Sequence, residues 1–175
     1  MPRSALVDTL GRRASSVRIP SMPQSRRTEI AWGEVSTELP PSQVQQTEYL
    51  SIDDVVQIVE MFSEAPLREA VRDLGLLIGA VDRPALKYRG MDVYTPLAMK
   101  AAAFMESLAR NNSLFDGNKR LAWLATNVFL ELNGATVHFS DNEIFSLLRE
   151  VQQGYLATNE LAHRLHTRIG PAQPR

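Results

Sequence analysis

Along most of the chain after residue 48, apolar residues recur every three or four positions, which is the spacing of one buried face of an α-helix. A first helix is predicted to begin at Ser51-Ile-Asp-Asp54, a sequence with the form of a capping box. A second apolar-periodic segment covers about residues 67–81. We expect Asp82-Arg-Pro84 to end it, because the residue before a proline disfavours the helical conformation.

The middle of the chain predicts a pair of helices that flank a polar turn. Residues 87–96 have a central glycine, aromatic neighbours and a closing proline, which is typical of a loop or short hairpin. Residues 97–110 are almost all strong helix formers and predict a buried helix. After the polar turn, a helix that is apolar nearly all round runs to Asn133-Gly134, a typical C-terminal stop. We expect this helix to be central.

The last third of the chain predicts two more helices. Ser140-Asp-Asn-Glu143 is a full capping box ahead of an apolar-periodic segment, and an amphipathic helix covers about residues 159–168. No run of residues has the pattern of a sheet with one hydrophobic face, and no internal repeat is visible. The predicted fold class is therefore all-α.

Residues 1–46 differ from the rest, since they are rich in Ser, Pro, Arg and Gln, with prolines that interrupt any regular element. This composition predicts a flexible N-terminal extension, either unstructured or, given its arginines, an arm that docks on a partner. In a chain of 175 residues this leaves one domain over 47–168 and a disordered tail over 169–175.

Composition narrows the class of protein. The 44% hydrophobic and 22% charged fractions are ordinary for a soluble protein, and no apolar run approaches the roughly 20 residues that span a bilayer. The formal net charge of -1 gives no overall basic field, so we expect no direct nucleic-acid binding. The absence of cysteine and of a secretory signal fits a cytoplasmic protein.

The polar turn, Arg110-Asn-Asn-Ser-Leu-Phe-Asp-Gly-Asn-Lys-Arg120, carries the candidate chemistry. The start of the second helix offers free N–H groups and a partial positive charge, and Gly117 lets an anion approach the backbone. Lys119 and Arg120 are disfavoured in a first helical turn unless an anionic ligand is bound there. Asp116 could bind the magnesium that accompanies nucleotide phosphates. Alternatively, Asp-Gly is an ordinary turn and Asp116 caps the helix.

Residues 112–120 resemble the signature of the Fic/Doc (Fido) family, and within it the Doc toxins: His-x-Phe-x-Asp-Gly/Ala-Asn-Lys-Arg. The resemblance extends over about residues 48–165. It implies a compact helical bundle with a short flap hairpin or loop, near residues 87–94, that precedes the motif helix pair and helps to align the target chain. It also implies a bacterial cytoplasmic toxin with a Phd-like antitoxin as partner. Doc proteins use ATP and Mg²⁺ to phosphorylate a threonine of elongation factor Tu and so inhibit translation.

The resemblance assigns roles to most residues of the turn. Asp116 matches the metal-binding acid. Gly117 and Asn118 match the turn that holds the anion, and Lys119 and Arg120 match the cations that contact phosphate.

Three further positions, Arg110, Asn112 and Leu114, complete the comparison. Arg110 matches an arginine of the Doc active site, and Leu114 replaces a phenylalanine that should pack inward. Asn112 occupies the position of the catalytic histidine, which accepts the proton of the target hydroxyl. Asparagine takes no proton, so chemistry should fall by roughly 10²- to 10⁴-fold while binding survives. The change is either natural or an inactivating change made to produce a toxic protein safely, and the presence of every other site residue favours the second.

Two other functions stay open. Fic relatives transfer AMP, although Lys119 stands where their motif has glycine. A naturally inactive Fido protein would act as a binding or regulatory module. Elsewhere, His163 and His166 could bind a metal, but we prefer to interpret them as part of a charged terminal helix. Trp123 could stack on an adenine, but a position in the core is the preferred interpretation.

Overall fold

A computed structural model of the chain describes residues 46–172. The elements, in order, are α2 (Ile52–Phe62), α3 (Leu67–Ala70), α4 (Leu74–Asp82), the 3-10 helix η1 (Arg83–Ala85), β1 (Lys87–Tyr88), β2 (Met91–Asp92), α5 (Leu97–Arg110), α6 (Asn118–Leu132), β3 (Ala135–Val137), α7 (Asp141–Gln153), α8 (Thr158–His166) and β4 (Ile169–Pro171). The described part is mostly helical with two small strand pairs, which confirms the predicted class. The predicted N-terminal extension, apart from its last residue, lies outside the described residues.

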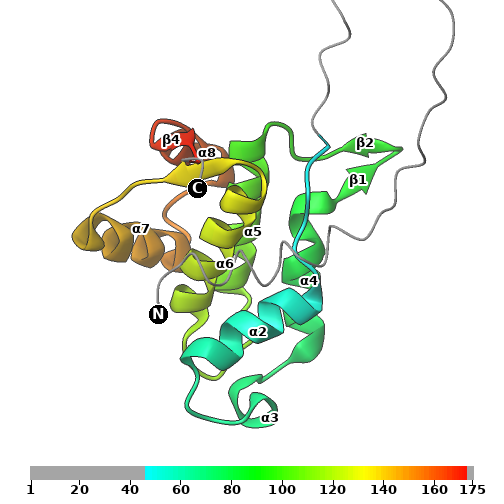
Figure 1. Cartoon of the computed structure of the whole chain (residues 1–175), viewed down its shortest axis with the longest axis vertical. Coiled ribbons are helices and arrows are strands. Elements are labelled where there is room, and N and C mark those ends of the chain that lie inside the picture. Colours follow the sequence, from blue (N-terminus) through cyan, green and yellow to red (C-terminus); the bar gives the residue numbers. More distant parts are fainter. Residues whose placement is uncertain (1–45, 173–175) are drawn as a thin grey trace, which may run out of the picture.

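Helices α5 and α6 form the centre of the molecule. Helix α5 packs against α4, α6, α7 and α8, while α6 packs against α2, α5 and α7. Figure 1 shows α7 on one side of this pair and α2 and α4 on the other. Three consecutive alanines, Ala101–Ala103, are buried in α5, and such small side chains let neighbouring helices approach closely. The expectation that the helix after the motif is central is confirmed.

The predicted helix starts at the two capping boxes are confirmed. The hydroxyl of Ser51 accepts from the backbone N–H of Asp54, and Ser140 accepts from Glu143 in the same way. In both cases the acidic side chain accepts a hydrogen bond from the cap residue's own N–H. These local interactions stabilise a helix terminus wherever the sequence supplies them, which is why they are predictable.

The segment over residues 67–81 is not one helix, because it breaks between α3 and α4. Val71 forms an isolated antiparallel bridge with Leu114, in the polar turn. The backbone N–H groups of Arg72 and Asp73 both donate to the carbonyl of Ser113, at 2.9 and 3.1 Å. Asp73 then caps α4. Backbone pairing with a distant segment outweighs the local periodicity here.

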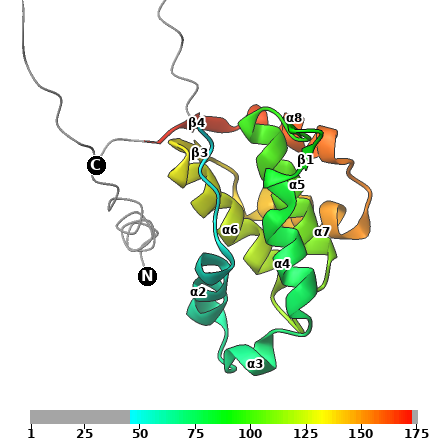
Figure 2. The same cartoon turned by 90° about the vertical axis from the view of Figure 1, so that its right-hand side faces the viewer.

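The predicted hairpin forms, as β1 and β2 pair antiparallel through a two-residue turn. Figures 1 and 2 place it at the end of the molecule opposite α3. The hairpin lies shortly before the first residue of α5, whereas the polar turn follows the last residue of α5. The 14 residues of this helix span about 21 Å. The structure therefore does not bring this hairpin to the polar turn, where a target-aligning flap would be expected.

The hairpin is fastened to the core by a buried lysine. The ammonium of Lys100, a 4% exposed residue of α5, donates to Asp92 of β2 at 2.5 Å and to the Tyr49 hydroxyl at 2.7 Å. The hydrogen bond from Lys100 lowers the pKa of Asp92. Burial by itself lowers the pKa of Lys100, but the bonds to Asp92 and Tyr49 outweigh it and raise that pKa. Both groups therefore stay charged at neutral pH.

The C-terminal boundary requires a correction. Ile169–Pro171 forms β4, which pairs antiparallel with β3, so the predicted disordered tail is wrong for these residues. The last helix also ends at His166 and not at Arg168. Strands of three residues have no readable alternation, so only pairing with a partner reveals them. Within residues 46–172, no helix is long and apolar enough to cross a membrane.

Candidate functional site: the turn between α5 and α6

The turn between α5 and α6 is held in shape by its own asparagine. The Asn118 side chain accepts from the backbone N–H of Leu114 at 3.0 Å and donates to the carbonyl of Leu114 at 2.8 Å. Leu114 is 2% exposed, so it packs inward as expected, and Phe115 donates its N–H to Ala70. The side chain of Asn118 is thus used within the turn, and only its backbone N–H is left to face a ligand.

The N-terminus of α6 is an open set of donors. Its cap residue, Gly117, has φ 87°, and no side chain caps the helix. Among the described residues, the backbone N–H groups of Asn118, Lys119 and Arg120 have no hydrogen-bond acceptor. The first turn also contains no acidic residue. The unpaired donors and the helix dipole together favour an anion at this position.

Gly117 is required by the packing as well as by its backbone angle. A Cβ atom at this position would lie 2.7 Å from the ring of Phe62. Any larger residue would force either the Phe62 ring or the turn to shift, and it would adopt a left-handed conformation that L-residues disfavour.

Asp116 does not cap α6, so the interpretation of this turn as an ordinary capped helix start is wrong. Its carboxylate accepts from the Gly117 N–H at 2.7 Å and is otherwise exposed. No group of three or more His, Cys, Asp or Glu side chains gathers in residues 46–172, so His163 and His166 are not part of such a group. A cation at Asp116 would take most of its oxygen ligands from water and a bound ligand. Magnesium binds in this way, so the donor set fits it.

The two cations of the turn point to different sides. The Lys119 ammonium donates to the Gln152 side chain of α7 at 3.1 Å. The Arg120 guanidinium lies over the Phe62 ring of α2, 5.4 Å from its centroid. Asp116, Gly117 and Arg120 line one cavity of about 400 Å³, and Lys119 is not part of its lining.

Arg110 lies on the same side as Lys119, at the C-terminal end of α7. Its guanidinium pairs with Glu106 at 2.6 Å, and the other oxygen of Glu106 accepts from Thr158 of α8. A Cβ at Gly154, the residue that caps the C-terminus of α7, would approach Arg110 to 3.4 Å. The sequence could have indicated Glu106 through its i,i+4 spacing to Arg110. Nothing in it indicated Gln152 or Gly154.

Asn112 follows α5 with φ 49°, a left-handed conformation that asparagine tolerates better than most residues. Its side chain is exposed, at the beginning of the turn. An amide can donate and accept hydrogen bonds, but it accepts no proton near neutral pH. The described site therefore keeps its anion donors and has no general base at this position.

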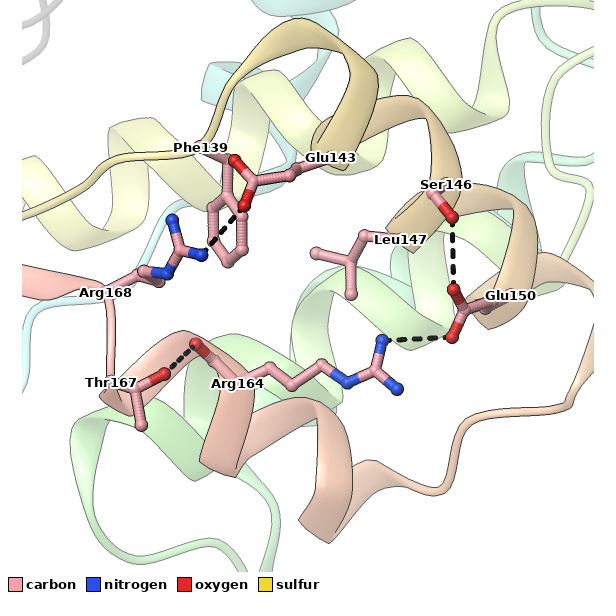
Figure 3. Close-up of a pocket in the computed structure, with 8 residues that line it drawn as sticks. All are labelled: Phe139, Glu143, Ser146, Leu147, Glu150, Arg164, Thr167 and Arg168. Carbon is pink, nitrogen blue, oxygen red and sulfur yellow. Dashed lines mark hydrogen bonds and ion pairs between the residues drawn. The ribbon is translucent and has the colours of Figure 1, made fainter.

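A groove between α7 and α8, drawn in Figure 3, is not a second candidate. Its charges pair with one another, since Arg168 contacts Glu143 at 2.8 Å and Arg164 contacts Glu150 at 3.0 Å. The backbone N–H and then the hydroxyl of Ser140, with a further contribution from Arg168, lower the pKa of Glu143 to about 2. These ion pairs link α7 to α8 and to the segment that follows α8.

Trp123 belongs to the core, as preferred from the sequence. It is 7% exposed and packs edge-on against Phe139, with ring centroids 6.0 Å apart. It therefore offers no open face to a nucleotide base.

The fold and site thus define a helical domain in which a polar turn leads into a helix whose N-terminus has no side-chain cap. Residues 42–130 match the model of the Fic/DOC family. Toxin Doc of Mycolicibacterium smegmatis (strain ATCC 700084 / mc(2)155) is 44% identical over 107 residues, which is 60% of this chain and 81% of that protein. The chain belongs to the Fic/DOC family.

Proposed function

We propose that this protein is a Doc-like toxin, a kinase-type transferase that uses ATP and Mg²⁺ to phosphorylate a threonine of elongation factor Tu and so inhibits translation. The uncapped N-terminus of α6, with Lys119 and Arg120 in its first turn, is the observation that carries the proposal. The similarity to a protein named as a Doc toxin supports the toxin role and a Phd-like antitoxin as partner.

The chain's own residues would act mainly by position and charge. The free N–H groups at residues 118–120 would hold phosphate oxygens, and Asp116 would hold Mg²⁺. Lys119, Arg120 and the Glu106-oriented Arg110 would place positive charge around them. Bound magnesium-ATP would supply the phosphoryl group. The metal would offset the negative charge on the oxygens of that phosphoryl group during transfer.

Asn112 explains why this form would be inactive or weak. The target hydroxyl must lose its proton as it attacks, and the asparagine amide takes no proton. We therefore expect nucleotide binding without efficient transfer.

Replacing Asn112 tests the proposal directly. The Asn112→His chain should transfer label from γ-labelled ATP to a threonine of elongation factor Tu about 10²- to 10⁴-fold faster than the Asn112 chain. Asn111→His, which places the same imidazole one residue away, is the matched control and should stay inactive. If the Asn112→His chain transfers no label, the assignment is refuted.

Transfer of the α-labelled group in the same assay would instead identify an AMP transferase.

Asn112 itself favours a second function, that of a naturally inactive Fido protein that binds nucleotide or a partner. This alternative predicts that expression of the Asn112→His chain leaves growth unaffected, whereas a Doc-like toxin should arrest growth unless its antitoxin is present.

A further inference from the structure

The side chain of Lys119, in the first turn of α6, is held by a residue from another helix. Its ammonium donates to the side-chain oxygen of Gln152 at 3.1 Å, and Gln152 lies in the last turn of α7. The two residues are 33 positions apart, so the packing of α7 against α6 brings them together. Both side chains are half-buried. The ammonium therefore has a defined position that the motif by itself does not give it.

The acceptor of this hydrogen bond is a neutral amide. Among the residues that the structure describes, Lys119 forms no ion pair, whereas Arg110, the other cation on this side of the turn, pairs with Glu106. A carboxylate in place of the amide would offset the charge of the ammonium, but a glutamine side chain carries no charge. Gln152 thus fixes the direction of Lys119 and leaves its positive charge available to an anion.

The C-terminal end of α7 supports the same two cations. The carbonyl end of a helix carries a partial negative charge, which stabilises cations nearby. Lys119 reaches this end through Gln152, and Arg110 lies beside Gly154, the residue that caps it. Helix α7 therefore holds positive charge next to the uncapped N-terminus of α6.

We propose that Gln152 is a positioning residue of the turn between α5 and α6: it holds the Lys119 ammonium in place and, being neutral, leaves its charge for phosphate. The inference rests on the proposed function, because it takes phosphate to bind at the N-terminus of α6. Gln152 acts through Lys119, and no contact with the phosphate is assigned to it. The site then extends beyond the motif to α7.

Calorimetry with magnesium-tripolyphosphate at several salt concentrations, on the chain as it exists, tests this role. Gln152→Glu keeps an oxygen at the same place and adds a negative charge. Affinity should fall roughly 3- to 30-fold and depend less on salt, because the charge of Lys119 is offset. Gln152→Leu removes the acceptor and adds no charge. Affinity should then fall by only about 2- to 5-fold, with an unchanged salt dependence, since Lys119 keeps its charge but loses its fixed position.

Gln153→Glu is the matched control, because it adds the same charge one residue further along α7. Gln153 is exposed, and within residues 46–172 its side chain has no contact with Lys119 like that of Gln152. This variant should change affinity by less than about 2-fold. In a Lys119→Ala chain, Gln152→Glu should lower affinity no more than Gln153→Glu does, because the ammonium that it offsets is gone.

Three results would overturn the role of Gln152 while phosphate binding at the turn stands. They are equal effects of Gln152→Glu and Gln153→Glu, an effect of Gln152→Glu that persists without the Lys119 ammonium, and a rise in affinity in Gln152→Leu. If the unmodified chain does not bind magnesium-tripolyphosphate at all, the proposed function fails, and the role of Gln152 fails with it.

Discussion

Helices α6 and α7 begin in opposite ways. The N-terminus of α7 is closed, because Ser140 and Glu143 satisfy each other's backbone N–H groups and Glu143 also pairs with Arg168. The N-terminus of α6 is open, with Gly117 as its cap residue and cations in its first turn. A closed terminus stabilises the fold, whereas an open terminus keeps its donors for a ligand. Helix α6 therefore lacks the local stabilisation that its cap gives to α7, which agrees with the binding role proposed for its N-terminus.

Among the substitutions that test this difference between α6 and α7, Gly117→Ala should have the largest effect. The added Cβ meets Phe62 at 2.7 Å, and φ 87° is unfavourable for alanine, so unfolding free energy should fall by roughly 1–3 kcal/mol. The rise in Tm caused by tripolyphosphate should also shrink, because the added Cβ disturbs the contact between the turn and Phe62. Thermal unfolding with and without the anion measures both effects.

Gly134→Ala is the control for this change, since Gly134 also has a positive φ, 71°, but nothing lies within 4 Å of its Cβ position. It should cost less stability and leave the anion effect intact. Equal losses in the two variants would mean that contact with Phe62 does not shape the site.

Ser140→Ala should open the closed terminus. Loss of the capping box should lower the unfolding free energy by about 1 kcal/mol in urea titrations. Tripolyphosphate should still stabilise the variant as it does the parent, since α6 is unaffected. Ser146→Ala, which removes an exposed side-chain hydrogen bond on the same helix, should change stability by less than about 0.5 kcal/mol. A large effect of Ser140→Ala on anion binding would contradict the separation of roles.

The smallest of these effects should be the loss of stability when Glu143 is protonated at acidic pH. Glu143 has its pKa lowered from 4.5 to about 2 in the folded protein, so its contribution to stability is present above pH 4.5 and is lost as the pH falls toward 2. The group is exposed to solvent, and salt should weaken the effect. Unfolding midpoints of the parent and Glu143→Gln should therefore converge between these pH values. A difference that persists at pH 2 would show that Glu143 acts through packing.

Short-range features of the fold were predictable, and long-range ones were not. Both capping boxes and the helix over 97–110 appear as predicted, because their interactions join residues three or four positions apart. The break between α3 and α4 and the strand β4 depend on pairing with residues far along the chain. Hydrophobic periodicity does not reveal such pairing. The sequence therefore predicts one helix over residues 67–81 where the structure has two, and it predicts a tail where the structure has β4.

The site divides in the same way. Motif spacing placed Asp116, Gly117 and Arg120 together, and the structure puts these residues around one cavity. The motif spacing did not show that the side chain of Asn118 closes the turn on Leu114. Nor did it show that Lys119 turns toward Gln152. These contacts depend on the direction in which each side chain leaves the backbone.

The sequence by itself determined the helical class, the starts of the capped helices and the identity of the motif residues, including asparagine at position 112. Local hydrogen bonds, helix propensity and side-chain chemistry are properties of short segments, so they can be recognised before folding. Only the tertiary structure decided that α6 begins uncapped, that its two cations part toward α2 and α7, and that Phe115 lines a cavity beside them. Those features follow from how distant helices pack, and packing is a property of the whole domain.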